Sequence, residues 1–171
     1  RNPMSSFARP FRRFFDPGAV PAEQLWAKTE DGLRLSIKRL HDHPTRGPVM
    51  LLHGLAGSSA TFHFPERSLA SYLATCGFDC YVVELRGGGD SEKPVGGWDT
   101  DDYVNHDLPA LISTIQRVSC HERIQWVGHS MGGVLLYCYG IKHPNAPISR
   151  GISVGSALDY TAGDSGFKRL L

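Results

Sequence analysis

Hydrophobic residues alternate with polar ones early in the chain and form short continuous runs later. Between Leu25 and Leu40, apolar Leu33, Leu35 and Ile37 alternate with polar neighbours, and Asp31-Gly32 supplies a tight turn. This pattern predicts a β-hairpin. The later runs PVMLLHGL, FDCYVVELRG, RIQWVGHS and GISVGSAL are nearly all apolar, which is typical of strands covered on both faces. The sequence therefore predicts six strands.

A first helix is predicted between the runs PVMLLHGL and FDCYVVELRG. We expect Pro65 to open this helix, because proline favours the first helical position. Leu69, Leu73 and Cys76 would then share one face, and Gly77 would end the helix.

Two further helices are predicted on either side of the run RIQWVGHS. One follows Thr100, and Pro109 inside it indicates either a kink or a helix start capped by Asp107. The other, MGGVLLYCYGIKH, is apolar on nearly every side and ends before Pro144. A hairpin followed by alternating strands and helices predicts an α/β fold, with a mostly parallel sheet and helices on both of its faces.

Length and composition indicate one globular domain rather than a disordered chain. The chain has 171 residues, of which 41% are hydrophobic and 20% are charged. Its formal charge of +1 is too small to favour nucleic acid or an anionic membrane as a partner. No apolar run is long enough for a transmembrane segment, and we expect a cytoplasmic location.

The first 22 residues differ from the rest in being rich in arginine, phenylalanine and proline. This composition resembles that of a transit peptide, but we favour a basic and aromatic linker or arm over residues 1–22, followed by the domain over residues 23–171. The cysteine spacings match no zinc pattern, and we expect reduced, structural thiols. These are Cys76, Cys80, Cys120 and Cys138.

The stretch QWVGHSMGG, residues 125–133, carries the strongest chemical signal. It contains the pattern G-x-S-x-G, with Gly128 and Gly132 two residues on either side of Ser130. The pattern alone is weak, because a strand-to-helix turn can contain a serine by chance. Here it joins a buried strand to a buried helix, where a sharp turn exposes the Ser130 hydroxyl at the helix N-terminus. We therefore predict that Ser130 is a nucleophile and that His129 packs beneath the turn.

The stretch LLHGLAGSSATF follows an earlier buried strand and predicts an oxyanion hole. A loop at this place supplies one backbone donor, and the residue after the nucleophile supplies the other. We predict that these donors are the N–H groups of Leu55 and Met131. Gly54 would let the backbone approach the substrate, and His53 would hold the loop by hydrogen bonds rather than transfer protons.

These motifs resemble those of the α/β-hydrolases, the superfamily of esterases, lipases and peptidases. The resemblance covers residues 25–171 and rests on HGLAGSS, ELRGGGDSEKP, DDYVNHDLPALI and VGHSMGG, in that order. The second motif carries the common R-G-x-G-x-S turn as Arg86, Gly87, Gly89 and Ser91. The stretch from HGL to CYVVELRG is also similar to the acid-lipase branch. The resemblance implies a serine hydrolase that cleaves carboxylic esters, including lipid esters, with no metal or organic cofactor.

The resemblance also implies a triad in the chain order serine, acid, histidine. His143 follows Ser130 but lies at the far end of the predicted helix, about 20 Å away at about 1.5 Å of rise per residue, so it is not the base. Asp159 follows the sixth strand, where some members place the acid, although an ordinary loop residue is the preferred interpretation. We therefore expect strands 1–6 of the family's eight in an incomplete, N-terminal portion of a larger enzyme. This portion would be inactive alone, with an unpaired edge strand and the base in the missing part.

Two alternatives remain open. An acyltransferase of the same fold would pass the acyl group to an acceptor other than water, and added alcohols or thiols would reveal it. A non-catalytic binding protein would keep the fold without a histidine after the eighth strand. Poly(hydroxyalkanoate) synthases have a similar layout but use cysteine, whereas position 130 is serine.

Overall fold

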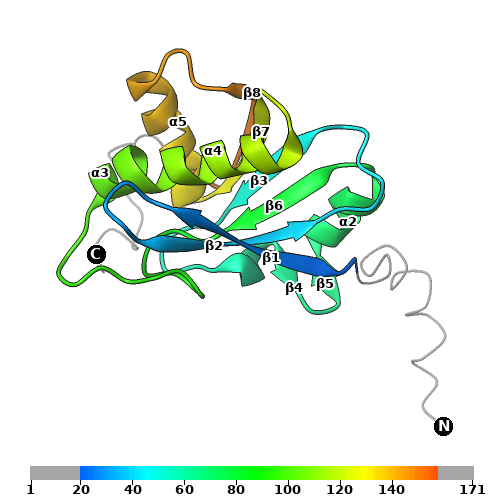
Figure 1. Cartoon of the computed structure of the whole chain (residues 1–171), viewed down its shortest axis with the longest axis horizontal. Helices are drawn as coiled ribbons and strands as arrows, with labels where there is room; N and C mark the ends of the chain where they lie inside the picture. The colour runs from blue at the N-terminus through cyan, green and yellow to red at the C-terminus, as the bar shows by residue number, and fades with distance from the viewer. Residues whose placement is uncertain (1–19, 158–171) are drawn as a thin grey trace, which may run out of the picture.

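A mixed β-sheet forms the centre of the molecule (Figure 1). The computed structural model describes residues 20–157, and within them six strands form the main sheet in the order β1-β2-β6-β3-β7-β8. Strands β6, β3, β7 and β8 are parallel, whereas β2 is antiparallel to β1 and β6. The bounds are β1 Ala22–Lys28, β2 Arg34–Leu40, β3 Pro48–Leu52, β6 Asp79–Val83, β7 Ile124–His129 and β8 Ile148–Val154. The predicted mostly parallel sheet is confirmed.

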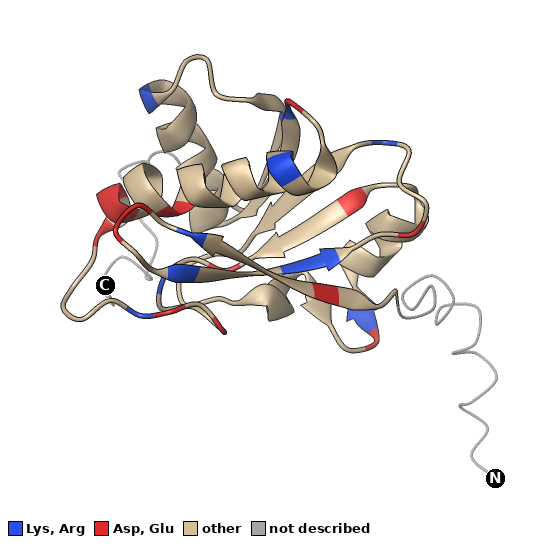
Figure 2. Cartoon of the chain, in the orientation of Figure 1, with Lys and Arg blue, Asp and Glu red and all other residues tan. Residues whose placement is uncertain are grey.

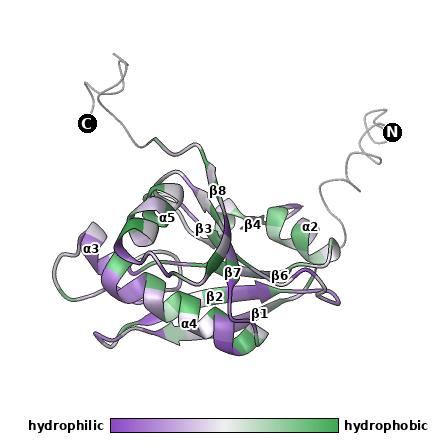
Figure 3. Cartoon of the chain, turned by 90° about the horizontal axis from the view of Figure 1, so that it is seen from above, coloured by the Kyte–Doolittle hydropathy of each residue, from purple (hydrophilic) through white to green (hydrophobic). Residues whose placement is uncertain are grey.

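Helices cover both faces of this sheet, as predicted. The helix α2 lies on one face and α4 and α5 lie on the other (Figures 1 and 3). The bounds are α2 Leu69–Thr75, α3 Thr100–Asp102, α4 Leu108–Ser119 and α5 Met131–Lys142. Shorter elements are a 3₁₀ helix η2 Ser59–Thr61, a π-helical stretch η3 Tyr103–Asp107, and a small hairpin of β4 His63–Phe64 and β5 Arg67–Ser68.

Alternate residues of β3 enter the cores on opposite faces of the sheet. Met50 and Leu52 are fully buried with residues of α4 and α5. Val49 and Leu51 are buried instead with Ala70 and Ala74 of α2. Because successive side chains of a strand point to opposite faces, a strand covered on both sides is apolar throughout. This is the physical origin of the continuous apolar runs in the sequence.

The helix α2 begins four residues later than predicted. Pro65 and Glu66 form the turn of the β4–β5 hairpin, and Glu66 has a φ of 66° there. The helix is capped by Ser68, whose hydroxyl accepts a hydrogen bond of 2.9 Å from the Ser71 N–H. The predicted apolar face is wrong in one residue: Leu73 packs against the core, as predicted, whereas Leu69 is exposed. Proline favours the second position of a turn as well as the first position of a helix, and here the turn uses it.

The irregularity expected at Pro109 is a π-helical stretch rather than a new helix start. The helix already begins at Thr100, where Asp99 and Asp102 form a capping box. The Leu108 N–H bonds back to the Tyr103 carbonyl, one residue beyond α-helical spacing. Asp107 has helical backbone angles, and within the described residues its side chain makes no cap bond. The alternative in which Asp107 caps a helix start is therefore wrong.

Several smaller expectations can be compared with residues 20–157. Within that range β8 pairs with β7 alone and forms an edge of the sheet, as expected. The four cysteines, all inside the range, are free thiols. No helix in the range is both long and apolar enough to span a membrane. Asp159 and most of the predicted arm over residues 1–22 lie outside the described residues.

Candidate active site

Ser130 occupies a strained turn between β7 and α5. Its φ of 50° and ψ of −118° lie in a region that residues with a side chain rarely adopt. The turn is held on both sides: the Ser130 N–H donates to the Val154 carbonyl at 2.8 Å, and the Ser130 carbonyl accepts from the Gly133 N–H at 2.9 Å. The structure thus places Ser130 in the backbone geometry that the sequence motif requires of a nucleophile.

The two glycines of the motif leave no room for a side chain. A Cβ atom on Gly128 would lie 2.2 Å from the Gly132 carbonyl oxygen. A Cβ on Gly132 would lie 2.4 Å from the carbonyl oxygen of Leu52, the last residue of β3. Both distances are far inside van der Waals contact. The turn therefore packs directly on the carboxyl end of the neighbouring strand, and this close approach depends on glycine.

The loop that follows β3 lies against the same turn. A Cβ atom on Gly54 would be 3.0 Å from the Ser130 Cβ, so the loop backbone passes directly beside the serine. A bond of 3.1 Å from the Gly57 N–H to the Gly54 carbonyl closes the loop into a tight turn, with Ala56 at a φ of 53°. The side chain of Leu55 is 77% exposed, which means that packing does not explain this residue's position.

A pocket of about 490 Å³ opens beside this loop, and both predicted oxyanion residues line it. Leu55 contributes from the loop and Met131 from the first turn of α5. Among the described residues, neither backbone N–H of this pair donates a hydrogen bond. Both donors are thus free to bind a ligand, and the Met131 N–H stands at the positive end of the α5 dipole.

His53 holds the loop in place through its ring. Its Nδ1 is 2.7 Å from the Gly54 carbonyl oxygen, to which it donates, and Nε2 accepts from the Leu85 N–H at 3.4 Å. Burial lowers the pKa of His53, although the bond to the Gly54 carbonyl opposes this effect. A neutral imidazole with both nitrogens engaged fits the predicted role in fixing the loop.

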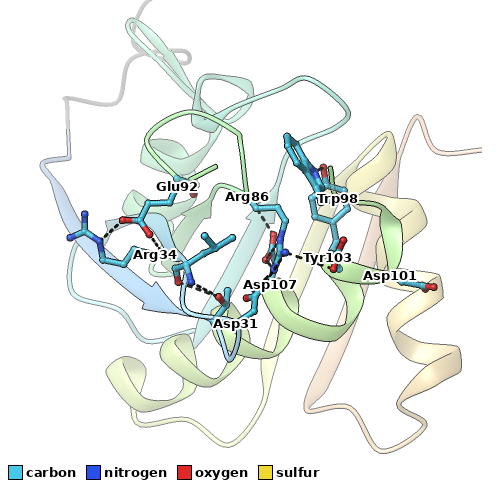
Figure 4. A network of polar contacts seen from close by, with 12 residues as sticks. Asp31, Arg34, Arg86, Glu92, Trp98, Asp101, Tyr103 and Asp107 are labelled. Atoms are coloured by element: carbon cyan, nitrogen blue, oxygen red, sulfur yellow. Dashed lines mark hydrogen bonds and ion pairs between the residues drawn. The ribbon is translucent and has the colours of Figure 1, made fainter. Parts of the chain in front are cut away.

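An ion-pair network centred on the buried residues Arg86 and Asp107 supports the other side of the pocket (Figure 4). Arg86, which lines the pocket, donates from Nε to Asp107 at 2.8 Å and from Nη1 to Asp31 at 2.9 Å. The Arg86 N–H also donates to Asp107 at 2.8 Å. Asp102 lies 3.8 Å from the same guanidinium, and Figure 2 shows the acidic residues of α3 beside those of the turn after β1. Four charged groups from three parts of the chain thus fix the start of the loop after β6.

Sequence reasoning missed two aromatic residues of the pocket wall. Trp98 and Tyr103 line the pocket, and the Trp98 Nε1–H donates to the Tyr103 hydroxyl at 2.6 Å. A Cβ on Gly87 would lie 2.8 Å from the Trp98 ring, so the ring packs directly on that backbone. The signal available in the sequence was Gly87 itself, because the first glycine of the R-G-x-G turn makes room for a large neighbour.

The interpretation of His129 as a residue packed beneath the turn is wrong. The side chain is exposed, because His129 follows Val127 on the face of β7 that α5 does not cover. Val127 is only partly buried, and a groove of about 450 Å³ runs along this face of β7 and β8. His143 ends α5 as expected and stacks on Tyr139 at a ring distance of 4.4 Å. Within the described residues, the Ser130 hydroxyl makes no hydrogen bond to a histidine.

Comparisons with known proteins agree with this geometry. The family model for the alpha/beta hydrolase fold matches residues 47–168. The chain belongs to the alpha/beta hydrolase fold family. Human lipase member M is 32% identical over 130 residues, which are 66% of this chain and 31% of that lipase. Human lysosomal acid lipase/cholesteryl ester hydrolase is also 32% identical over 130 residues, and the match covers 66% of this chain and 33% of that enzyme. The expected similarity to acid lipases is confirmed.

Solved structures show the same hydrolase fold. An alpha/beta hydrolase from Novosphingobium aromaticivorans has a TM-score of 0.65 at 28% identity, covering 80% of this chain and 45% of that one. An esterase from Exiguobacterium antarcticum, at 23% identity and a TM-score of 0.65, covers 80% of this chain and 46% of the esterase. This hydrolase-fold chain spans about a third of the length of the lipases that it matches.

Proposed function

We propose that the protein is a serine hydrolase that cleaves carboxylic esters, including lipid esters, through an acyl-enzyme. The observation that carries this proposal is the strained backbone of Ser130 directly beside the Gly54 loop. A serine held at the start of a helix with free backbone N–H groups nearby is suited to attack a carbonyl carbon. The names of the matched relatives, a lipase and a cholesteryl ester hydrolase, support ester substrates.

In the proposed reaction the Ser130 hydroxyl oxygen attacks the ester carbonyl. The carbonyl oxygen gains negative charge, and the N–H groups of Leu55 and Met131 donate hydrogen bonds to it. A general base takes the Ser130 proton and passes it to the leaving oxygen as the tetrahedral intermediate collapses, so the alcohol departs and the acyl group stays on Ser130. Water then attacks the acyl group and releases the acid, so Ser130 regains its proton.

The general base is proposed to come from outside residues 20–157. His53 is committed to the loop through both ring nitrogens. His143 lies at the opposite end of α5 from Ser130, and His129 is a neighbour of the nucleophile rather than a partner across the pocket. A triad histidine must reach the serine hydroxyl at hydrogen-bond distance, and the part of the chain that the structure describes supplies no such contact.

The pocket wall suits an apolar substrate group. Leu55, Met131 and the Trp98 ring line the same cavity of about 490 Å³. Arg86 lines it as well, but the charge of its guanidinium is already matched by Asp107 and Asp31. Among the described residues, the cavity lining therefore offers no unpaired cation to attract a charged acyl group, which favours neutral esters.

Ester hydrolysis by the natural protein that contains this sequence tests the proposal. With a p-nitrophenyl ester as substrate, Ser130→Ala should lower kcat on the order of 10⁶-fold while leaving the circular dichroism spectrum unchanged. Unchanged hydrolysis by Ser130→Ala would overturn the assignment. Added methanol separates hydrolysis from acyl transfer: if most of the acyl group appears as methyl ester at low methanol concentration, an acyltransferase is the better assignment.

A further inference from the structure

A second buried carboxylate lies behind the candidate site, and no step of the proposed reaction uses it. Glu84 directly follows β6 and is 1% exposed. Its Oε1 accepts a hydrogen bond of 2.8 Å from the Ser59 N–H, and its Oε2 accepts one of 2.8 Å from the Asp90 N–H. A buried carboxylate that accepts hydrogen bonds from two backbone N–H groups holds together the chain segments to which these groups belong.

The two donors directly follow the two stretches of loop, residues 55–58 and 85–89, that line the pocket. Ser59 is the first residue of η2, directly after the loop of residues 54–58, and Asp90 lies in the loop after β6. Lys38 reinforces the junction, since its Nζ donates to the Ser59 hydroxyl at 2.9 Å and lies 3.5 Å from the Asp90 carboxylate. Glu84 thus stands at the point where both loops meet.

The backbone at Gly89 packs closely against the Glu84 carboxylate. A Cβ on Gly89 would lie 2.1 Å from the Glu84 Oε1, so the loop after β6 can wrap the carboxylate only with glycine at that position. Burial alone would raise the pKa of Glu84, but the hydrogen bonds from the Ser59 and Asp90 backbones, together with those from the Ser59 and Ser36 side chains, outweigh burial and lower the pKa. The group is therefore ionised at neutral pH and acts as an acceptor for both loops.

We infer that Glu84 is a positioning residue that holds the loop of residues 54–58, and with it the Leu55 N–H, at its place beside Ser130. This inference rests on the proposed function for its catalytic consequence. An oxyanion donor is effective only when it is held close to 3 Å from the developing charge before the reaction begins. Glu84 reaches this donor through the Ser59 backbone, four residues along the same loop, and does not touch the substrate.

Asp79 provides a matched control on the same strand. It lies at the opposite end of β6, is 3% exposed, and accepts bonds from Arg39 and Tyr81 rather than from the pocket loops. Glu84→Gln and Asp79→Asn each replace a buried carboxylate by its amide. Comparing kcat and loop exchange between the two variants therefore separates the effect of the contact with the loops from the general cost of altering a buried charge.

The test measures kcat, KM, thermal midpoint and amide hydrogen exchange of residues 54–58 in the natural protein and both variants. Glu84→Gln should lower kcat about 10- to 100-fold with little change in KM, and it should speed exchange in the loop. Asp79→Asn should lower the thermal midpoint but leave kcat within about twofold and the loop exchange unchanged. If Glu84→Gln does not fold, Glu84→Asp keeps the charge and withdraws it from both N–H groups, and should show the same changes more weakly.

Hydrogen exchange separates this inference from the proposed function. If the wild-type protein hydrolyses no ester, the proposed function fails, yet faster exchange of residues 54–58 in Glu84→Gln alone would still support the positioning role. Equal exchange in the wild type and Glu84→Gln would overturn the inference, whatever the activity. Loss of kcat by the same factor in both variants would also overturn it, because a general structural role would then account for the effect.

Discussion

The two ends of β6 use buried carboxylates in different ways. At the amino end, Asp79 accepts from the Arg39 guanidinium at 2.9 and 3.0 Å and from the Tyr81 hydroxyl at 2.7 Å. At the carboxyl end, Glu84 accepts from the backbones of Ser59 and Asp90. Side-chain partners at the first end join neighbouring strands of the sheet. Backbone partners at the second end fix loops that would otherwise be free to move.

This difference shows where the fold places its irregular backbone. The carboxyl ends of β3, β6 and β7 carry the Gly54 loop, the loop after β6 and the Ser130 turn. Loops at the carboxyl ends of parallel strands meet at one edge of a sheet, and ligand sites of open α/β sheets lie there. We therefore expect changes at this end to affect activity, and changes at the amino end to affect stability alone.

The largest effect is expected at Gly128, where the turn is most crowded. Gly128→Ala should destabilise the natural protein by more than about 3 kcal/mol, because its Cβ would press on the Gly132 backbone at 2.2 Å. Gly140→Ala is the control in α5, where an added Cβ meets no atom within 4 Å; it should stabilise by about 0.5–1 kcal/mol. Urea unfolding of both variants measures the contrast. Similar unfolding free energies for Gly128→Ala and Gly140→Ala would show that the turn at the carboxyl end of β7 is not tightly packed.

An intermediate effect is expected from the titration of His53. Burial lowers its pKa below the ordinary value of 6.5, so the unfolded chain binds a proton more readily than the folded one. The stability that this neutral histidine contributes is complete above about pH 6.5 and decreases as the pH falls from there toward the folded-state pKa. Unfolding free energies of wild type and His53→Gln, measured from pH 8 to pH 5, should differ in slope below pH 6.5. Parallel curves would contradict the buried, neutral state.

The smallest effect is expected at the Leu55 side chain. It is 77% exposed, and the proposed donor is its backbone N–H, which every residue except proline retains. Leu55→Ala should therefore change kcat by less than about twofold and stability by less than about 0.5 kcal/mol. A hundredfold loss of kcat on a small p-nitrophenyl ester would show that the side chain, rather than the backbone, acts at the carboxyl end.

Features set by neighbours in sequence could be predicted, and those set by distant partners could not. The strands and the Ser130 turn were predictable because apolar runs and the glycines beside the serine act locally. The role of Glu84 was not, because one of its partners, Ser59, lies 25 residues away. Asp107 resembles a helix cap in sequence, but a distant arginine, Arg86, engages it. The exposure of His129 depends on which face of β7 the helices cover, and periodicity does not specify that choice.

The most direct test of the account is to find the residue of the natural protein that a fluorophosphonate ester modifies. Such reagents phosphonylate an activated serine with loss of fluoride, and cleavage after Arg123 and Lys142 yields a peptide whose single serine is Ser130. Mass spectrometry should find the adduct on this peptide, with loss of ester hydrolysis in proportion to labelling and no adduct in Ser130→Ala. Ester hydrolysis that persists after Ser130 is fully labelled, or an inactivating adduct on another residue, would contradict the assignment of Ser130 as the nucleophile.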